Sequence, residues 1–278
     1  MKTVVITGTS SGIGKACAQR MAGEGWRVYA GVRSDEDGQR LAAESGGDLR
    51  PVILDVTSDE HCEALAARVD AENGGRLDGL VNNAGVYLNG PLEYISMDEL
   101  RTMMAVNVVG LMGVTRALLP ALRAAAGRIV NISSISGLVA LPGVSGYAAS
   151  KHAVEAITDS LRVELEPFGM HVSAVEPGSI ATEIWRKGRE RDAERDAEAE
   201  NSEAERLYAP VIRLLRKINE NPKGIPPERV AEAVEDALTS SNPDNRYLVG
   251  KDAKALALLR KLPDAIRDKL IAARAWRD

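Results

Sequence analysis

The stretch KTVVITGTSSGIG, residues 2–14, decides the fold. An apolar, strand-like run (2–7) passes directly into a glycine-rich turn that opens a segment with helical spacing. Glycines let the backbone turn tightly, and a helix start offers free N–H groups and a positive dipole end to a phosphate. The spacing G-x-x-x-G-x-G departs from the general fingerprint G-x-G-x-x-G, so the turn alone also fits a structural strand-to-helix corner. The candidate phosphate-binding residues are Gly8, Ser10, Ser11, Gly12, Ile13 and Gly14.

Short apolar runs alternate with segments of helical spacing along the rest of the chain. After residues 4–6, such runs occupy 28–30, 52–54, 79–81, 129–132, 172–175 and 246–249. Continuous apolar strands separated by helices imply a parallel sheet that is covered on both faces. We therefore predict an α/β fold of the Rossmann type: a doubly wound sheet of about seven parallel strands, in one domain over residues 1–278.

Composition excludes several classes of function. A net charge of −5 argues against broad nucleic-acid binding, which needs a basic face. Cys17 and Cys62 have no ligand-like spacing, and with three histidines in the chain we expect no metal site and a reduced, cytoplasmic setting. Residues 129–150 carry no charge and are long enough to cross a bilayer. Asn131, Pro142 and several serines and glycines instead indicate a strand, a loop and a helix start, so we expect no membrane span.

Three features of the helical segments lead to expectations. Pro120 lies late in the helix predicted from near Met97, where we expect a kink or break. Residues 185–206 alternate Arg, Asp and Glu, which fits either a solvated helix held by ion pairs or a mobile lid. Residues 183–221 are thus a candidate substrate lid. Residues 252–278 are expected to form a C-terminal helical extension.

Tyr147 and Lys151 are four residues apart and therefore share one face of a helix. A tyrosine has an ordinary pKa of about 10, and a nearby ammonium group favours the phenolate and lowers that value. Such tuning suits a general acid or base. Ser134 follows the strand at 129–132, at the sheet edge where parallel sheets place ligands, and its hydroxyl is suited to bind a substrate oxygen.

These motifs together resemble the short-chain dehydrogenase/reductase family over roughly residues 2–182, and more loosely to 250. The matching pieces, in the family's order, are Thr7-Gly8-xxx-Gly12-x-Gly14, Asn82-Asn83-Ala84-Gly85, Asn107, Ser134, Tyr147-xxx-Lys151 and Pro177-Gly178. The resemblance implies an oxidoreductase that transfers a hydride between a nicotinamide dinucleotide and a carbonyl or secondary alcohol.

The same resemblance assigns a role to each matching residue. Tyr147 would be the acid/base, Ser134 would orient the carbonyl oxygen, and Lys151 would lower the tyrosine pKa and hold the nicotinamide ribose. Asn107 would hold a water in a proton relay to Lys151; the alternative is a polar break in an apolar helix. Besides Tyr147 and Lys151, the implied cofactor-binding residues are Asp55, Val56, Asn82, Ala84, Gly85, Pro177, Gly178, Ile180 and Thr182. A turn aspartate is the alternative for Asp55.

The end of the second strand predicts a preference for NADP(H), with NAD(H) left open. Relatives selective for NAD usually end this strand in an acidic residue, and the corresponding position here is Val32, followed by Arg33. A guanidinium pairs well with a 2′-phosphate, and Ser10 and Ser11 can add hydrogen bonds. The acidic residues 35–37 are the competing partners of Arg33.

The substrate is expected to be a small apolar carbonyl or alcohol. Residues 134–142 resemble the hydroxysteroid and retinol dehydrogenase branch, where Ile135, Val139 and Leu141 either form an apolar wall or only pack the loop. The resemblance also implies a homodimer or homotetramer. Two alternative functions stay open: a non-catalytic dinucleotide sensor or scaffold, and an epimerase or dehydratase on the same fold.

Overall fold

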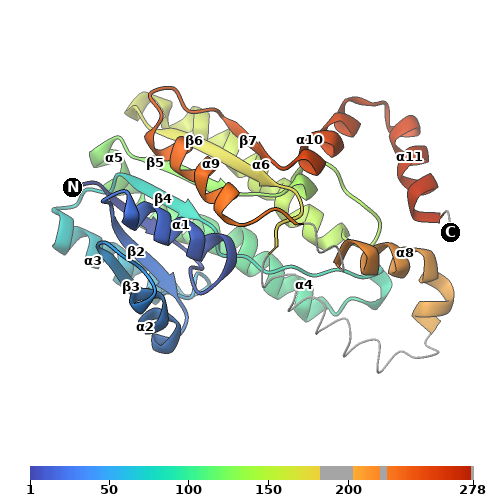
Figure 1. Cartoon of the computed structure of the whole chain (residues 1–278), viewed down its shortest axis with the longest axis horizontal. Helices are drawn as coiled ribbons and strands as arrows, with labels where there is room; N and C mark the ends of the chain where they lie inside the picture. Colours follow the sequence, from blue (N-terminus) through green and yellow to red (C-terminus); the bar gives the residue numbers. More distant parts are fainter. Residues whose placement is uncertain (182–202, 220–223, 277–278) are drawn as a thin grey trace.

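A parallel sheet of seven strands in the order β3-β2-β1-β4-β5-β6-β7 forms the centre of the molecule (Figure 1). The computed structural model describes residues 1–181, 203–219 and 224–276. All six neighbouring strand pairs are parallel, which confirms the predicted sheet. The strands are β1 (Thr3–Ile6), β2 (Arg27–Val32), β3 (Leu49–Ile53), β4 (Gly79–Asn82), β5 (Arg128–Ile132), β6 (His171–Pro177) and β7 (Arg246–Val249).

Helices connect the strands and cover both faces of the sheet. They are α1 (Gly12–Gly23), α2 (Asp35–Ala43), α3 (Asp59–Asn73), α4 (Met97–Met104), α5 (Leu111–Ala125), α6 (Ser145–Leu165) and α9 (Glu228–Thr239). The chain runs outward from β1 to β3, then returns to β4 on the other side of β1. In open parallel sheets, such a reversal leaves a crevice at the carboxyl ends of the strands, where ligands bind.

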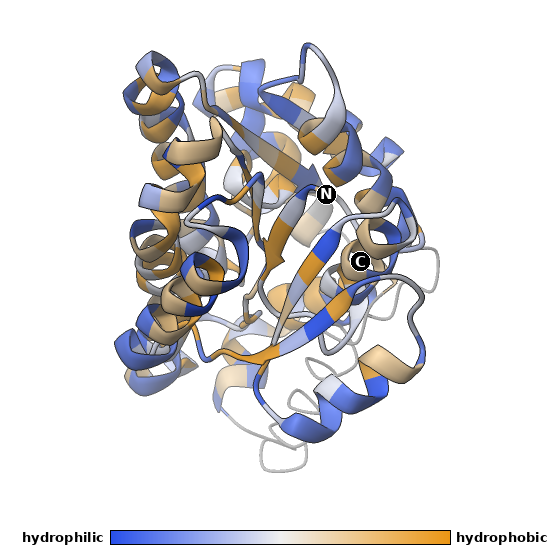
Figure 2. Ribbon diagram, turned by 90° about the vertical axis from the view of Figure 1, so that its left-hand side faces the viewer, coloured by the Kyte–Doolittle hydropathy of each residue, from blue (hydrophilic) through white to orange (hydrophobic). Residues whose placement is uncertain are grey.

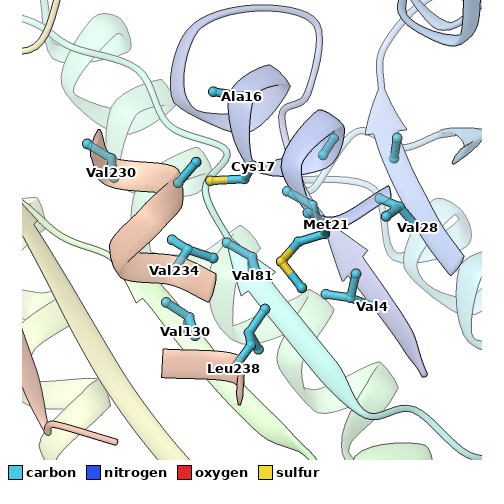
Figure 3. Packing of buried hydrophobic residues seen from close by; sticks show 14 of the residues in the cluster. Val4, Ala16, Cys17, Met21, Val28, Val81, Val130, Val230, Val234 and Leu238 are labelled. Carbon is cyan, nitrogen blue, oxygen red and sulfur yellow. The ribbon is translucent and has the colours of Figure 1, made fainter. Parts of the chain in front are cut away.

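Alternation along the strands produces one apolar core on each face of the sheet. Val4 and Ile6 of β1 pack with α1, α2 and α9, whereas Val5 between them packs with α3 and α5. Figure 3 shows the first core, where Cys17 and Met21 of α1 meet Val234 of α9 over the strands. In Figure 2 the strands at the middle of the sheet are largely hydrophobic, as burial on both faces requires.

The helical stretch after Ser96 is irregular at its middle rather than at its proline. Between α4 and α5 lies a π-helical segment, η2 (Ala105–Gly110). Helix α5 continues through Pro120 to Ala125, so the break expected there is not present. Buried Leu118 and Leu122 on either side of Pro120 hold this part of the helix against the sheet. A π-helical turn often marks a functional position.

The helical stretch from Met97 is apolar because part of it packs into the core. By length and composition alone, Met97–Ala125 is one helical stretch that satisfies the requirement for crossing a membrane, with a mean hydropathy of 1.6. Its buried residues, among them Val114, Leu118 and Leu122, belong to the second core of the sheet. Residues 129–150, uncharged in sequence, form β5, a loop and the start of α6.

The chain after β6 adds helices at the far end of the sheet. They are α8 (Glu203–Asn219), α10 (Lys251–Ala257), the 3₁₀ turn η5 (Leu258–Lys261) and α11 (Asp264–Trp276). Helices α8 and α11 are in contact and lie side by side at the right of Figure 1. Most of the charged stretch 185–206 lies outside the described residues, as does residue 182.

Candidate active site

The glycine turn between β1 and α1 has the backbone of a phosphate cradle. Gly8 and Gly12 have φ of +68° and +57°, a backbone conformation that residues other than glycine rarely adopt. A Cβ at Gly14 would collide with the carbonyl oxygen of Gly8 and the side-chain amide of Asn83. The first turn of α1 has no acidic residue, and Ser11 at its N-cap makes no side-chain capping bond. The helix N-terminus therefore keeps its N–H groups for an anion.

Asn83 and Thr7 tie this turn to the end of β4. The Asn83 amide donates to the carbonyl oxygens of Thr7 and Gly8, both at 2.9 Å. The Thr7 hydroxyl accepts from the backbone N–H groups of Asn83 at 3.0 Å and Ala84 at 2.9 Å. The two strands on either side of the switch point thus fix one rigid turn. Asn83 and Gly85 also line the cavity described below; from this motif, the sequence analysis named Asn82, Ala84 and Gly85 as cofactor-binding residues.

Ser134, Tyr147 and Lys151 come together at the carboxyl end of β5. Ser134 begins the 3₁₀ turn η3 (Ile135–Gly137), while Tyr147 and Lys151 lie one turn apart on α6. The buried Lys151 Nζ donates to the carbonyl oxygen of Ile132 at 2.8 Å and lies 5.8 Å from the centre of the Tyr147 ring. Tyr87 packs edge-on against Tyr147, with ring centres 4.8 Å apart. Tyr87 is a site residue that the sequence interpretation missed.

Burial controls the proton affinities of this group. It raises the pKa of Tyr147 to about 12, and the hydrogen bond with Ser134 acts in the opposite direction. Burial also lowers the pKa of Lys151 to about 8, against the charge of Glu155. The tyrosine pKa is therefore raised where the sequence predicted that Lys151 would lower it. The reason is that the loss of solvent around the phenol outweighs the hydrogen bond with Ser134.

Asn107 lies in the π-helical segment and is fully buried. Its Oδ1 accepts from the N–H of Val86 at 2.8 Å, and its amide donates to the carbonyl of Val86 at 2.9 Å and to the Ser150 hydroxyl at 3.1 Å. A Cβ built at Gly85 would lie 3.3 Å from Asn107 Oδ1 and 3.8 Å from Lys151 Nζ. Gly85 thus places no side chain between the asparagine and the lysine.

Three other predicted cofactor residues, Asn82, Val56 and Asp55, lie in the sheet or in the turn after β3. The Asn82 amide is buried in the sheet and donates to Thr115 Oγ1 and Asn131 Oδ1, both at 2.9 Å, so its side chain is part of the sheet interior. Val56 is buried as well. Asp55 follows β3, and hydrogen bonds from Thr57 lower its pKa, with a smaller contribution from the charge of Arg33. Asp55 is therefore both a turn residue and a neighbour of Arg33.

Arg33 follows β2 as predicted and is exposed. One of its expected competitors is occupied: Asp37 donates its backbone N–H to Ser34 and pairs with Arg40 through its carboxylate. Within the residues that the structure describes, Arg33 forms no ion pair. Ser10 and Ser11 lie half-buried in the glycine turn.

The segment after β6 forms one edge of the site. Pro177, Gly178 and Ile180 line the cavity, and Ile180 is held by a bridge to Ile225. The Asp252 carboxylate accepts from the N–H of Ser179 at 2.7 Å, a contact that no sequence pattern indicated. Thr182 lies outside the described residues.

A cavity of about 770 Å³ joins these pieces. Its polar end holds Asn83, Ser134, Tyr147 and Lys151. The remaining wall is mainly apolar, and its far side comes from the C-terminal helices. Its aliphatic residues include Ile135, Leu141, Val144, Leu214, Ile218, Leu256, Leu259, Leu270 and Ile271. Ile135 and Leu141 were predicted, whereas Val139 is buried outside the lining.

The arrangement agrees with comparisons to known proteins. Residues 2–193 match the family model described as short chain dehydrogenase. The chain belongs to the short-chain dehydrogenase/reductase family. It is 37% identical to short-chain dehydrogenase/reductase family 9C member 7 of Bos taurus, over 98% of this chain and 89% of that protein. It is 36% identical to retinol dehydrogenase 16 of Mus musculus, over 97% and 87%.

A bacterial relative and two solved structures extend the comparison. The NADPH-dependent 3-dehydrocapnine reductase of Ornithobacterium rhinotracheale is 34% identical, over 97% of this chain and 96% of that protein. A short-chain dehydrogenase structure from Streptomyces avermitilis is 32% identical with a TM-score of 0.81, covering 98% of this chain and 95% of that one. One from Burkholderia cenocepacia in complex with NADP is 28% identical with a TM-score of 0.75, covering both chains fully. This short-chain dehydrogenase/reductase is thus an oxidoreductase of CH–OH and C=O groups.

Proposed function

We propose that the protein is an NADP(H)-dependent oxidoreductase of apolar carbonyls and secondary alcohols, with Tyr147 as its acid/base. The observation that carries the proposal is the cavity itself. Ser134, Tyr147 and Lys151 form its polar end, beside a glycine cradle, and aliphatic side chains form most of the rest. A sensor or scaffold needs the cradle but not this constellation.

The residues of this chain fit a nicotinamide dinucleotide. The turn around Gly8, Gly12 and Gly14 has the close backbone that a pyrophosphate requires, because no Cβ has room at Gly14. Lys151 would hold the nicotinamide ribose, and Pro177 to Ile180 would border the carboxamide. When bound, the dinucleotide supplies or accepts a hydride at C4 of its nicotinamide ring.

Tyr147 holds the proton that reduction of a carbonyl would require. A phenol with a pKa of about 12 keeps its proton at neutral pH, so Tyr147 is ready to donate to a carbonyl oxygen as that oxygen gains charge. Ser134, which hydrogen-bonds to Tyr147, would bind the same oxygen. Lys151 has a pKa of about 8 and exchanges protons readily near neutral pH. The lack of a side chain at Gly85, between Lys151 and Asn107, suits a water that returns the proton.

Preference for NADP(H) rests on Arg33. Its exposed guanidinium follows β2 and has no ion-pair partner within the described residues, and Val32 before it is apolar. Two half-buried hydroxyls, Ser10 and Ser11, lie in the neighbouring turn. Arg33→Ala is expected to reduce the ratio of kcat/KM for NADPH to that for NADH about tenfold or more. A wild type that favours NADH, or an unchanged ratio in Arg33→Ala, would remove Arg33 as the phosphate-reading residue.

An apolar substrate fits the cavity wall and the names of two relatives, a retinol dehydrogenase and a 17-beta-hydroxysteroid dehydrogenase. The direct test is a screen of NADPH oxidation with apolar aldehydes and ketones, steroids and retinoids. The proposal predicts one mole of alcohol per mole of NADPH oxidised. Isomerised or dehydrated product without net NADPH oxidation would favour an epimerase or dehydratase. NADPH binding without any turnover would favour a sensor.

We also propose assembly into a homodimer or homotetramer through α4, α5 and α6. Val109 and Met112 near the start of α5 and Val163 on α6 are 61%, 43% and 69% exposed. Exposed apolar side chains along neighbouring helices are typical of protein–protein interfaces. Light scattering of the wild type should give a multiple of 29.7 kDa, and a strict monomer at micromolar concentration would contradict assembly.

A further inference from the structure

The last 28 residues carry a net charge opposite in sign to that of the rest of the chain. Residues 251–278, here the basic tail, contain eight Lys or Arg and four Asp or Glu, a net charge of +4. The whole chain carries −5, so residues 1–250 carry −9. Such segregation concentrates the positive potential of an acidic protein on one short segment.

Most cations of the basic tail have no acidic partner among the described residues. Five of them are exposed and form no ion pair in the described part of the chain. They are Lys251, Lys254, Arg260, Lys261 and Lys269. Asp264 and Asp268 both pair with Arg267, and Asp252 accepts from the backbone of Ser179. The described part of the tail therefore carries an excess of unpaired positive charge.

Large apolar side chains stand among these cations. Leu258, Ile266 and Leu270 are 61%, 51% and 50% exposed. Ile266 and Leu270 are one turn apart on α11 and so share a face. Leu270 also lines the substrate cavity, as does Leu259 beside Leu258, so η5 and α11 form part of the cavity wall. Positive charge and exposed apolar groups thus occur together on segments that line the cavity.

We propose that the basic tail docks this enzyme on a membrane surface that carries anionic lipids. A short helix that combines Lys and Arg with exposed Leu and Ile is the usual form of a segment lying in the lipid interface. A second copy of the chain is disfavoured on this surface because the two tails would repel. A nucleic acid would satisfy the cations but would leave Leu258 and Ile266 in water. The proposal concerns binding only and does not depend on the reaction catalysed.

The experiment is flotation of the full chain with vesicles of phosphatidylcholine alone or with about 30% phosphatidylglycerol. Wild type should float with the mixed vesicles, remain unbound with the neutral ones, and be released by high salt. Lys261→Glu/Lys269→Glu should weaken binding about tenfold or more, because each cation contributes separately. Leu258→Ser/Ile266→Ser, which leaves the charge unchanged, should also weaken binding about tenfold.

The matched control is Arg76→Glu/Arg229→Glu, which makes the same change in charge at exposed sites between α3 and β4 and on α9. This variant should float like the wild type. Circular dichroism and NADPH affinity should match the wild type in every variant, which confirms folding. Wild type that does not bind the mixed vesicles would overturn the proposal. So would equal losses in the control, full binding by Leu258→Ser/Ile266→Ser, or duplex DNA that binds as tightly as the vesicles.

Discussion

The two sides of the cavity are built in different ways. On the cofactor side, polar atoms of Thr7, Asn83 and Asn107 are tied to backbone groups at 2.8–3.0 Å across neighbouring strands and helices. On the substrate side, α8, α10 and α11 contribute aliphatic side chains such as Leu214, Ile218 and Leu270. The first side fixes the positions of reacting groups, whereas the second is mainly apolar, with Lys217 and Asp252 as the charged residues of its lining. Changes on the two sides should therefore affect different kinetic constants.

The largest effect is expected on the cofactor side, for Gly14→Ala. The added Cβ would collide with the Gly8 carbonyl and the Asn83 amide, so the cradle must open. NADPH affinity, measured by fluorescence titration, should fall more than about 100-fold. Gly23→Ala near the end of the same helix is the control, because its Cβ meets nothing within 4 Å. Equal affinities in the two variants would contradict the cradle.

A cluster of ion pairs around Arg246 gives the next largest effect. Arg246 of β7 pairs with Glu155 on α6, Glu176 on β6 and Asp159. Arg246→Ala would leave the buried Glu155 and Glu176 without their cation, a loss of about 3–5 kcal/mol in unfolding free energy. The exposed Arg229–Glu232 pair is the control, where Arg229→Ala should cost about 0–1 kcal/mol. Urea unfolding measures the unfolding free energy of both variants, and equal losses would contradict a buried ion-pair cluster.

The same ion-pair cluster predicts a dependence of stability on pH. Burial and the neighbouring Glu155 raise the pKa of Glu176 from its ordinary 4.5 to about 7, against the pull of Arg246. Between these values the folded chain holds a proton that the unfolded chain has lost. This contribution to stability is therefore full below about pH 4.5 and disappears as pH rises through 7. Tm should fall from pH 5 to 8, and Glu176→Gln should flatten that fall; an unchanged slope would contradict the assignment.

The smallest effect is expected on the substrate side, for Ile218→Ser. Loss of one partly buried aliphatic group should raise KM for an apolar ketone about tenfold. NADPH affinity and kcat should stay within about twofold, because no reacting group moves. Leu207→Ser on the same helix, 57% exposed and outside the cavity lining, is the control. A fall in kcat without a change in KM would mean that α8 positions the reacting groups.

The contrast also explains which features the sequence predicts. The cradle, the Tyr147–Lys151 pair and Ser134 depend on residues that are close in sequence and on strand ends, which local patterns reveal. Asn107 followed from family resemblance, and the structure adds the π-helical segment that carries it. The raised pKa of Tyr147 did not follow, because spacing reports a neighbouring charge but not the extent of burial.

Features that depend on distant contacts were missed. Tyr87 meets Tyr147 only after β4 and α6 come together, and Asp252 reaches Ser179 across β7. The far wall of the cavity comes from α8, within the predicted lid segment, and from the predicted C-terminal extension; the sequence predicted these segments but not which of their side chains would line the cavity. The break expected at Pro120 was wrong because tertiary packing of α5 compensates for one lost hydrogen bond.

Single-turnover hydride transfer in Tyr147→Phe tests the central claim, that Tyr147 donates the proton on the rigid side of the cavity. The measurement mixes enzyme with bound NADPH and the best ketone from the substrate screen, and follows NADPH absorbance in a stopped-flow instrument. Phenylalanine keeps the ring contact with Tyr87 but removes the hydroxyl. We expect a rate about 10²–10⁴-fold lower, with the Kd for NADPH within about twofold of wild type. A rate near that of the wild type would show that another group supplies the proton.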